Sequence, residues 1–332
     1  SDPRRLRMIV HAHKFAAFGG LLALSALCSS AHAQVQAARS DPGNRARILV
    51  VRGDNPDPVE FKVFKKGVII DVAPTASGRF VAAVVADRTT RGGPTFRLHL
   101  MDESGATFRR VEHVQQFAFS PDERFVAVIR GHGYEGGPGF FPESVDILGL
   151  AGPDLGAIRG LEKATQIRWS RFSDDGLVLL ARVYEGRSTV VEYIMNTRTV
   201  VPTDYRGLNF SPDGRYYYLT PGESLRANLC QAGLAHDSCV RVFARNQYRA
   251  LPINLSATHR RPLGWAGDQQ LILANERNHD CEIYNVTGRR TEQNLQSVDW
   301  RWSTRPGFVV RRPDPSPNFR KLGKPQIRAL LQ

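Results

Sequence analysis

The chain has few groupings of the residue types that do chemistry in proteins. His279, Asp280, Cys281 and Glu282 follow one another, and all four belong to types that bind zinc. Successive side chains of a strand point to opposite faces, so at most alternate members could share one ion. The chain contains no G-x-S-x-G nucleophile elbow and no H-E-x-x-H zinc pair. We therefore expect no metal, no cofactor and no catalytic residues, and we interpret this segment as a turn that enters a strand.

A more specific feature is the segment Gly131–Glu143, whose sequence is GHGYEGGPGFFPE. Its glycines predict a long loop, and it carries three aromatic residues, Tyr134, Phe140 and Phe141. Aromatic side chains on a loop can stack on a peptide or a sugar. The alternative is that the rings fold back over the edge of a sheet. We predict Tyr134, Phe140 and Phe141 as binding residues.

The elements that must position this loop repeat along the chain. Each copy has apolar alternation, a turn rich in Ser, Pro, Asp or Gly, and then a strongly apolar run. The best copies are Val114–Arg130 and Arg206–Thr220, and looser ones are Val68–Asp87, Thr165–Val183, Pro262–Glu276 and Ser297–Arg311. The first bulky residues after these turns are 45, 52, 39, 55 and 37 residues apart. A period of this length made of short strands is typical of the blades of a β-propeller.

Each period has room for two further strands, so we predict an all-β propeller over residues 34–312, with six blades of four antiparallel strands. The sixth copy supplies only two strands before a proline-rich end. Arg47–Gly53 and Val59–Phe64 are strands without a turn motif, and we expect them to pair with Ser297–Arg312. The N- and C-terminal strands would then close the last blade and remove exposed sheet edges. An open sandwich, or a propeller of five or seven blades, is the alternative.

Two copies of the repeat carry a family resemblance. FSPDERFVAVI at Phe119–Ile129 and FSPDGRYYYL at Phe210–Leu219 resemble the repeat of TolB-type propellers. That family includes the periplasmic TolB of the Tol-Pal envelope system and the propeller domains of some peptidases. The resemblance implies the fold and leaves the function open, because the motif builds a turn. Asp122 and Asp213 would accept hydrogen bonds from the turn backbone, and Gly214 permits a positive φ. We expect a relative of TolB without its separate α/β domain.

The predicted meander has two different faces. Turns of the SPDG type join first and second strands at one face, and the long segments between second and third strands emerge at the other. This second face carries Gly131–Glu143 and Pro221–Ser238, so we expect binding there. Four tryptophans come near the ends of first strands, which line a central channel: Trp169, Trp265, Trp300 and Trp302. They could stack on a ligand, but large aromatics more commonly fill the space between blades.

The first 33 residues have the three parts of a secretory signal peptide. Four basic residues come first, and they are Arg4, Arg5, Arg7 and Lys14. An apolar stretch, Phe15–Leu27, is too short to span a bilayer, and Ala31-His32-Ala33 fits the small-x-small cleavage rule. We predict a signal peptide over residues 1–33, with 1–7 as extra residues, and a periplasmic or secreted mature chain.

The charge of the chain suits an anionic partner. Its 45 Lys and Arg outnumber 32 Asp and Glu, and six of the basic residues lie between Arg311 and Arg328. Residues 313–332 are therefore a basic, proline-rich tail, either a disordered end or an anchor to an anionic envelope surface. No recognition helix or RNA-binding aromatic signature accompanies the charge, so we expect no nucleic acid. We also expect no transmembrane segment, because no apolar run is long enough.

An oxidising compartment makes Cys230 and Cys239 candidates for a disulfide, because the loop between them is short and contains glycine. Such a bridge would contribute about 2–3 kcal/mol to stability. Cys281 would then be a buried strand residue. Pairing of Cys239 with Cys281 is the alternative.

These features predict an exported, monomeric, non-catalytic propeller that binds a protein or an anionic envelope polymer through its loop-rich face. The alternative is a glycan- or peptide-processing enzyme, a lyase or hydrolase, with a site at the mouth of the central channel. Two or more carboxylates or histidines converging at that mouth would favour the enzyme. A structural element of a larger secreted assembly is a third option.

Overall fold

The computed structural model describes residues 34–53, 55–88, 94–133, 140–172, 176–220, 240–247, 249–251, 260–275, 280–295, 298–299 and 310–311. The predicted signal peptide, the predicted tail, Cys230 and Cys239 lie outside these residues. The described residues form strands and turns without a helix, so the all-β prediction is confirmed. Accordingly, none of them belongs to a helix of the length and apolarity that a membrane span needs.

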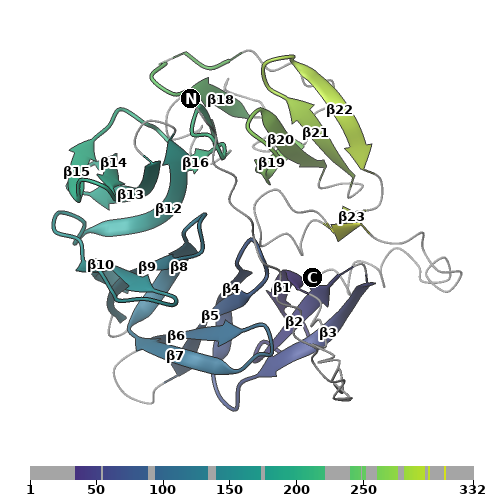
Figure 1. Cartoon of the computed structure of the whole chain (residues 1–332), viewed down its shortest axis with the longest axis vertical. Helices are drawn as coiled ribbons and strands as arrows, with labels where there is room; N and C mark the ends of the chain where they lie inside the picture. Colours follow the sequence, from purple (N-terminus) through teal and green to yellow (C-terminus); the bar gives the residue numbers. More distant parts are fainter. Residues whose placement is uncertain are drawn as a thin grey trace, which may run out of the picture. The chain divides into compact units, whose positions relative to one another are not determined.

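Six antiparallel sheets of three or four strands form the six blades of a β-propeller, in the order of the chain (Figure 1). The first two blades contain β1 (Val35–Ser40), β2 (Arg47–Arg52) and β3 (Asn55–Val63), then β4 (Val68–Pro74), β5 (Phe80–Arg88), β6 (Pro94–Asp102) and β7 (Thr107–Glu112). The third and fourth contain β8 (Val114–Phe119), β9 (Phe125–Gly133), β10 (Phe140–Gly149) and β11 (Gly156–Ala157), then β12 (Ala164–Phe172), β13 (Gly176–Tyr184), β14 (Ser188–Ile194) and β15 (Thr199–Pro202). The last two contain β16 (Asn209–Phe210), β17 (Tyr216–Leu219) and β18 (Arg241–Ala244), then β19 (Arg260–Trp265), β20 (Gln270–Asn275), β21 (Cys281–Asn285) and β22 (Arg290–Leu295). β23 (Val298–Asp299) and β24 (Val310–Arg311) pair with each other.

The core lies between neighbouring blades. Val84 and Leu98 of the second blade pack with Val126 of the third, and Ile147 of the third packs with Leu179 of the fourth. All five side chains are fully buried. Burying one such side chain contributes about 1.5–3 kcal/mol, and β-branched residues suit the pleated surface of a strand. The apolar runs that follow each turn in the sequence thus supply the contact between blades.

The repeated turns have the predicted hydrogen bonds. Ser120 Oγ donates to Asp122 Oδ1 at 2.6 Å, and the Arg124 amide donates to the same oxygen at 3.2 Å. Asp213 accepts the equivalent bonds from Ser211 at 2.6 Å and from the backbone of the residue two positions later. Gly214 has a φ of 72°, as predicted. The motif that resembles TolB-type propellers therefore builds turns between first and second strands.

Two tryptophans tie neighbouring blades together. The indole Nε1 of Trp169 in β12 donates to the Ala118 carbonyl in β8 at 2.9 Å. The Nε1 of Trp265 in β19 donates to the Asn209 carbonyl in β16 at 3.0 Å. Both bonds join an inner strand to the inner strand of the preceding blade. The packing interpretation is confirmed for these two residues, whereas Trp300 and Trp302 lie outside the described residues.

The first blade differs from the prediction. β1, which we did not expect, pairs with β2, and β2 also pairs with β3, so both edges of Arg47–Arg52 are occupied. β1 therefore takes the place that we expected Ser297–Arg312 to hold beside this segment. Val35 and Ala38 are fully buried against the second blade, which explains why this short segment becomes a strand. Closure of the ring by the C-terminal strands stays a prediction, because residues 300–309 lie outside the described ones.

The loop predicted over Gly131–Glu143 is shorter than expected. β9 continues to Gly133 and β10 begins at Phe140, and the two strands pair through Phe141 and His132. A Cβ atom at position 131 would strike the Phe141 carbonyl, so glycine is needed there for the close approach of the two strands. At least part of the glycine-rich sequence thus serves strand pairing, and residues 134–139 remain between the strands.

Candidate functional site

The starts of the first strands meet at a pocket of about 240 Å³, here called the inner pocket. Its walls come from the third, fourth and fifth blades and are formed by Gln116, Thr165, Gln166, Arg168, Arg182, Leu208, Asn209 and Thr220. In a meander, first strands start and second strands end at the face where the connections between second and third strands emerge. The inner pocket therefore opens at the face that the sequence predicts to bear the binding loops.

A repeated β-bulge prepares the polar lining of this region. The pairing register of the inner strand shifts between Val114 and Gln116, and again between Ala164 and Gln166. The inner strand β4 has the same shift just before Asp71. A bulge bends the strand and re-aims the side chain that follows it. Three successive blades thus present a polar residue, Asp71, Gln116 or Gln166, at the same place in the repeat.

Hydrogen bonds hold several lining side chains in place. Gln116 Oε1 accepts from the Ile167 amide at 3.1 Å and so joins the third blade to the fourth. Arg182 Nε donates to Gln166 Oε1 at 3.0 Å, and its Nη2 reaches the Arg206 carbonyl at 3.5 Å. Arg182 is therefore oriented along the pocket wall before any ligand arrives, which lowers the entropic cost of binding.

Asp71 and Arg168 influence each other although they belong to the second and fourth blades. The carboxyl of Asp71 reaches solvent but protein surrounds it on most sides, and this burial raises its pKa. The Arg168 guanidinium and the Val72 amide act in the opposite direction and lower the pKa of Asp71. Two inner strands that are not neighbours can interact in this way because both face the middle of the ring.

The lining of the inner pocket suits an anion. Two guanidinium groups and three side-chain amides supply mostly hydrogen-bond donors. Among the described lining residues there is neither a carboxylate nor a histidine, so the cluster that would favour the enzyme alternative is not found within them. Guanidinium groups bind carboxylate and phosphate groups through paired hydrogen bonds. What the described wall offers is therefore recognition of acidic groups.

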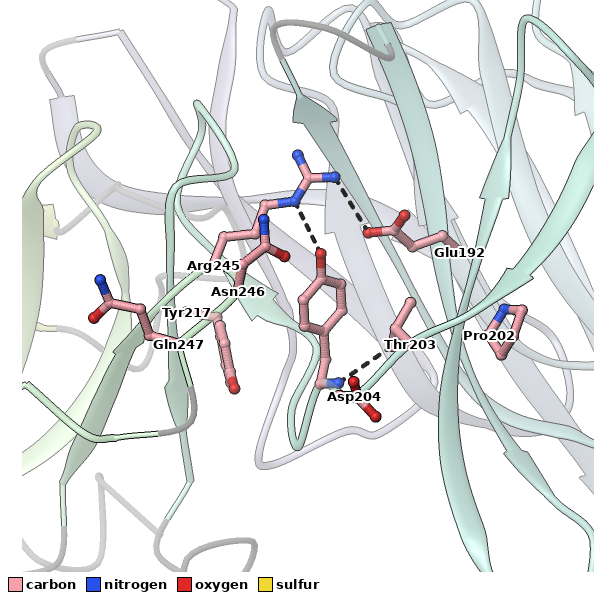
Figure 2. Close-up of a pocket in the computed structure, with 9 residues that line it drawn as sticks. Glu192, Pro202, Thr203, Asp204, Tyr217, Arg245, Asn246 and Gln247 are labelled. Atoms are coloured by element: carbon pink, nitrogen blue, oxygen red, sulfur yellow. Dashed lines mark hydrogen bonds and ion pairs between the residues drawn. The ribbon is translucent and has the colours of Figure 1, made fainter.

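A second pocket, of about 330 Å³, lies between the fourth and fifth blades (Figure 2). We call it the rim pocket. Its lining comes from β14, the end of β15, β17 and the segments after β15 and β18, and consists of Glu192, Pro202, Thr203, Asp204, Tyr205, Tyr217, Arg245, Asn246 and Gln247. Figure 2 shows the Arg245 guanidinium directed at the carboxylate of Glu192.

The polar centre of the rim pocket is a compact network. Arg245 Nε donates to the Tyr205 hydroxyl at 2.9 Å, and its Nη2 lies 3.7 Å from Glu192 Oε1. Glu192 is only 6% exposed, so its charge depends on this cation for compensation. Burial, and to a smaller extent the nearby Glu192 carboxylate, raise the pKa of Tyr205 to about 12, while the guanidinium opposes the shift. The phenol is therefore neutral at any physiological pH and can donate a hydrogen bond.

Aromatic rings support this network from behind. The Tyr205 ring meets Phe210 edge-on at a centroid distance of 4.9 Å, and Tyr217 stacks on Phe243 at 5.2 Å. Burial raises the pKa of Tyr217, whose hydroxyl bonds to the Arg206 backbone. Such ring pairs contribute about 0.5–1.5 kcal/mol beyond the area they bury. Tyr205 is consequently a fixed wall of the pocket.

The predicted binding residues do not share one environment. Phe140 is partly buried and meets Phe96 of the second blade edge-on at 5.6 Å. Phe141 points the other way, is 49% exposed, and lies beside His132 at 5.7 Å. Tyr134 lies outside the described residues. Phe140 is packed as the fold-back interpretation describes and Phe141 is exposed, while binding by Tyr134, Phe140 and Phe141 stays a prediction.

Cys281 belongs to both the disulfide alternative and the segment that we considered for a metal ion. Its thiol is free and buried in β21, so the alternative pairing with Cys239 is not formed. Burial, with a contribution from Asp280, raises the pKa of this thiol to about 12. No group of three potential metal ligands occurs among the residues that the structure describes. The predicted bridge between Cys230 and Cys239 lies outside them.

Sequence reasoning missed both pockets. The inner pocket had a usable signal, because Asp71, Gln116 and Gln166 are polar residues at equivalent positions of three repeats. Aligning the copies by column, and not only by their turns, would have found them. The rim pocket had none, since Glu192 and Arg245 look like ordinary strand and turn residues and meet only through the packing of two blades.

Comparison with known proteins assigns no function to the chain. No family model matches the chain, and no curated protein matches its sequence. Among solved structures, the chain is similar to the hydrazine synthase of Kuenenia stuttgartiensis, with 15% identity, a TM-score of 0.47, and coverage of 73% of this chain and 71% of that one. It is similar to the Cps50 (Swd1) β-propeller domain of Myceliophteria thermophila, with 14% identity, a TM-score of 0.43, and coverage of 80% and 87%. The β-propeller domain of the trilobed protease of Pyrococcus furiosus has 11% identity, a TM-score of 0.42, and coverage of 68% and 71%. These values transfer no activity to the chain, whose fold class rests on its own strand pairing.

Proposed function

We propose that this chain is an exported, monomeric, non-catalytic propeller that binds acidic groups of a protein or of an anionic envelope polymer at its loop-bearing face. The observation that carries the proposal is the presence of two guanidinium groups, Arg168 and Arg182, in the wall of the inner pocket. Arg182 is half-buried and Arg168 is exposed, so a charged hydrogen bond from Arg168 contributes about 0.2–1 kcal/mol, the range of an exposed charge pair.

Exposed aromatic rings support a macromolecular partner. Phe141 is 49% exposed near the start of β10, and Tyr184 is 58% exposed at the end of β13. Both ends belong to the face at which the inner pocket opens. Aromatic residues are enriched in protein interfaces, where they anchor the contact. A partner that inserts an acidic group into the inner pocket would cover these rings as well.

Three sequence features support export. Residues 1–33 have the parts of a secretory signal, and the repeats resemble those of TolB-type propellers, which include an envelope protein. The closely spaced Cys230 and Cys239 suit a disulfide in an oxidising compartment. Without residues 1–33 the chain keeps 41 of 45 basic and 31 of 32 acidic residues, and the resulting net charge of +10 favours anionic partners in that compartment.

The test uses the mature chain, residues 34–332, and two probes. Poly-L-glutamate represents an acidic protein segment, and polyphosphate represents an anionic polymer. We expect Arg168→Gln to weaken binding of the preferred probe by about twofold to fivefold, because an exposed charge-assisted bond is lost. Arg171→Gln is the matched control, since Arg171 is an exposed arginine on the same strand and lies outside the pocket lining.

The outcomes of this titration distinguish binding at the inner pocket from attraction by the overall charge of the chain. Weaker binding by R168Q, with unchanged binding by R171Q, supports anion binding at the inner pocket. The probe that binds with the higher affinity tells whether the partner carries carboxylates or phosphates. Equal weakening by R168Q and R171Q would mean that the overall charge of the chain attracts the probes, and it would overturn the proposal. Absence of binding by either probe would overturn it as well.

A further inference from the structure

The rim pocket between the fourth and fifth blades has a wall that is both aromatic and polar (Figure 2). We propose that it binds a neutral pyranose sugar residue. The proposal concerns a second site, and it does not depend on the anion-binding function of the inner pocket. Its volume of about 330 Å³ falls within the range of ligand pockets, at the end suited to small ligands.

A sugar ring needs a flat apolar surface for its C–H face. Tyr205 lines the pocket and is held at both ends, by Arg245 at its hydroxyl and by Phe210 at its ring. Tyr217 is only 3% exposed and packs behind this wall, with its ring centroid 5.8 Å from that of Tyr205. An aromatic wall that is already fixed presents its surface without losing side-chain freedom on binding.

The hydroxyl groups of a sugar both donate and accept hydrogen bonds, and the rim pocket offers both kinds of partner. Arg245 and the amides of Asn246 and Gln247 can donate, whereas the Thr203 hydroxyl already donates its proton to the Val190 carbonyl at 2.7 Å. The carboxylates of Glu192 and Asp204 and the same amide oxygens can accept. A single carboxylate or phosphate group needs donors alone and an ammonium group needs acceptors alone, whereas this mixture suits a polyol.

The charge at the centre of the rim pocket is balanced. Glu192 and Arg245 lie 3.7 Å apart, so each charge largely compensates the other. A ligand with a full charge would have to compete with this ion pair for one of its members. A neutral ligand can bond to both members and leave the pair in place. The buried position of Glu192 therefore favours an uncharged occupant.

Asn246 is in an unusual backbone conformation. Its φ is 65°, in the left-handed region that glycine adopts freely and that few residues other than asparagine share. The turn that holds it is closed by a hydrogen bond from the Gln247 amide to the Ala244 carbonyl at 3.1 Å. This turn places two consecutive amide side chains, Asn246 and Gln247, in the pocket lining. Glycine could form the same turn but would supply no polar group.

This conformation gives a variant that removes a binding group without endangering the fold. Asn246→Gly deletes the amide at a position where glycine is favoured, so we expect the thermal melting temperature to stay the same or to rise. Arg198→Gly is the matched control, because Arg198 also has a positive φ, of 56°, and lies outside the pocket lining. The probes are glucose, galactose and N-acetylglucosamine at millimolar concentration, measured by saturation-transfer NMR and calorimetry on residues 34–332.

We expect at least one of the three sugars to bind the unchanged chain and the R198G variant equally. N246G should bind the same sugar about tenfold more weakly, because its amide bonds are lost. Binding that N246G retains in full would place the sugar elsewhere and overturn the proposal. Failure of all three sugars to bind would also overturn it, as would binding of free lysine or glutamate at the rim pocket in their place. None of these results depends on poly-L-glutamate or polyphosphate binding at the inner pocket.

Discussion

Asp71 and Arg168 lie on inner strands of the second and fourth blades. Burial raises the pKa of the Asp71 carboxyl, and the Arg168 guanidinium opposes part of this rise. This relationship crosses the third blade and couples the inner pocket to a titratable group. Asp71 is also a carboxylate that competes with any anionic ligand for Arg168. Both consequences can be measured.

Removing the Asp71 charge should strengthen anion binding. We expect Asp71→Asn to raise the affinity of the mature chain for dextran sulfate about twofold to fivefold, the range of a partly exposed charge pair. The affinity of the unchanged chain should rise as the pH falls through the raised pKa of Asp71, because protonation removes the competing charge. Dextran sulfate keeps its own charge over this range. A pH profile that is the same for the unchanged chain and D71N would contradict the coupling.

Blade cohesion should depend on the tryptophan bonds between inner strands. Trp169→Phe keeps most of the ring but leaves the Ala118 carbonyl without its indole donor. We expect a loss of about 2 kcal/mol in the free energy of unfolding and a lower melting temperature. Tyr184→Phe is the control, because this ring is 58% exposed and should tolerate the loss of its hydroxyl. A melting temperature of W169F equal to that of Y184F would show that the hydrogen bond from Trp169 to Ala118 does not hold the blades together.

Much of the fold could be predicted from the repeat, because the spacing of Ser and Asp in each turn motif predicts the hydrogen bonds of that turn. Ser211 and Asp213 are an example, since their spacing predicts the bonds that the structure contains. β1 could not be predicted in this way, because Val35–Ser40 has no turn motif and becomes a strand only through burial against the second blade. The rim pocket could not be predicted for a similar reason, since Glu192 and Arg245 are 53 positions apart and come together only when two blades pack.

Acid should destabilise the protein through His99. This side chain is 5% exposed, and burial, assisted by the cations Arg110, Arg97 and Lys62, lowers its pKa to about 4 from an ordinary 6.5. His99 is thus protonated at a lower pH in the folded chain than in the unfolded chain. The free energy of unfolding therefore decreases as the pH falls from about 6.5 to about 4. The loss should reach about 3 kcal/mol at the acid end.

A substitution isolates this titration. His99→Phe keeps a ring beside Phe64, whose centroid lies 4.7 Å from that of His99, and removes the ionisable group. We expect urea unfolding of H99F to depend less on pH between 6.5 and 4 than that of the unchanged chain. A difference between the two proteins that stays constant over this range would exclude His99 as the cause.

The thiols should differ sharply in reactivity. Cys281 is buried and its pKa is raised to about 12, so iodoacetamide should not modify it in the native chain. After unfolding without reductant, mass spectrometry should find alkylation at Cys281 alone if Cys230 and Cys239 form the predicted bridge. Reduction before unfolding should add the other two. Alkylation of all three without reductant would contradict the disulfide.

Hydrogen–deuterium exchange of the mature chain, with and without poly-L-glutamate, tests the central claim most directly because it locates the bound anion. The inner pocket takes its two arginines from β12 and β13. We predict that the probe protects amides of residues 164–172 and 176–184, and that R168Q loses this protection while R171Q keeps it. Protection confined to the basic segment 313–332, with β12 and β13 unchanged, would contradict the account.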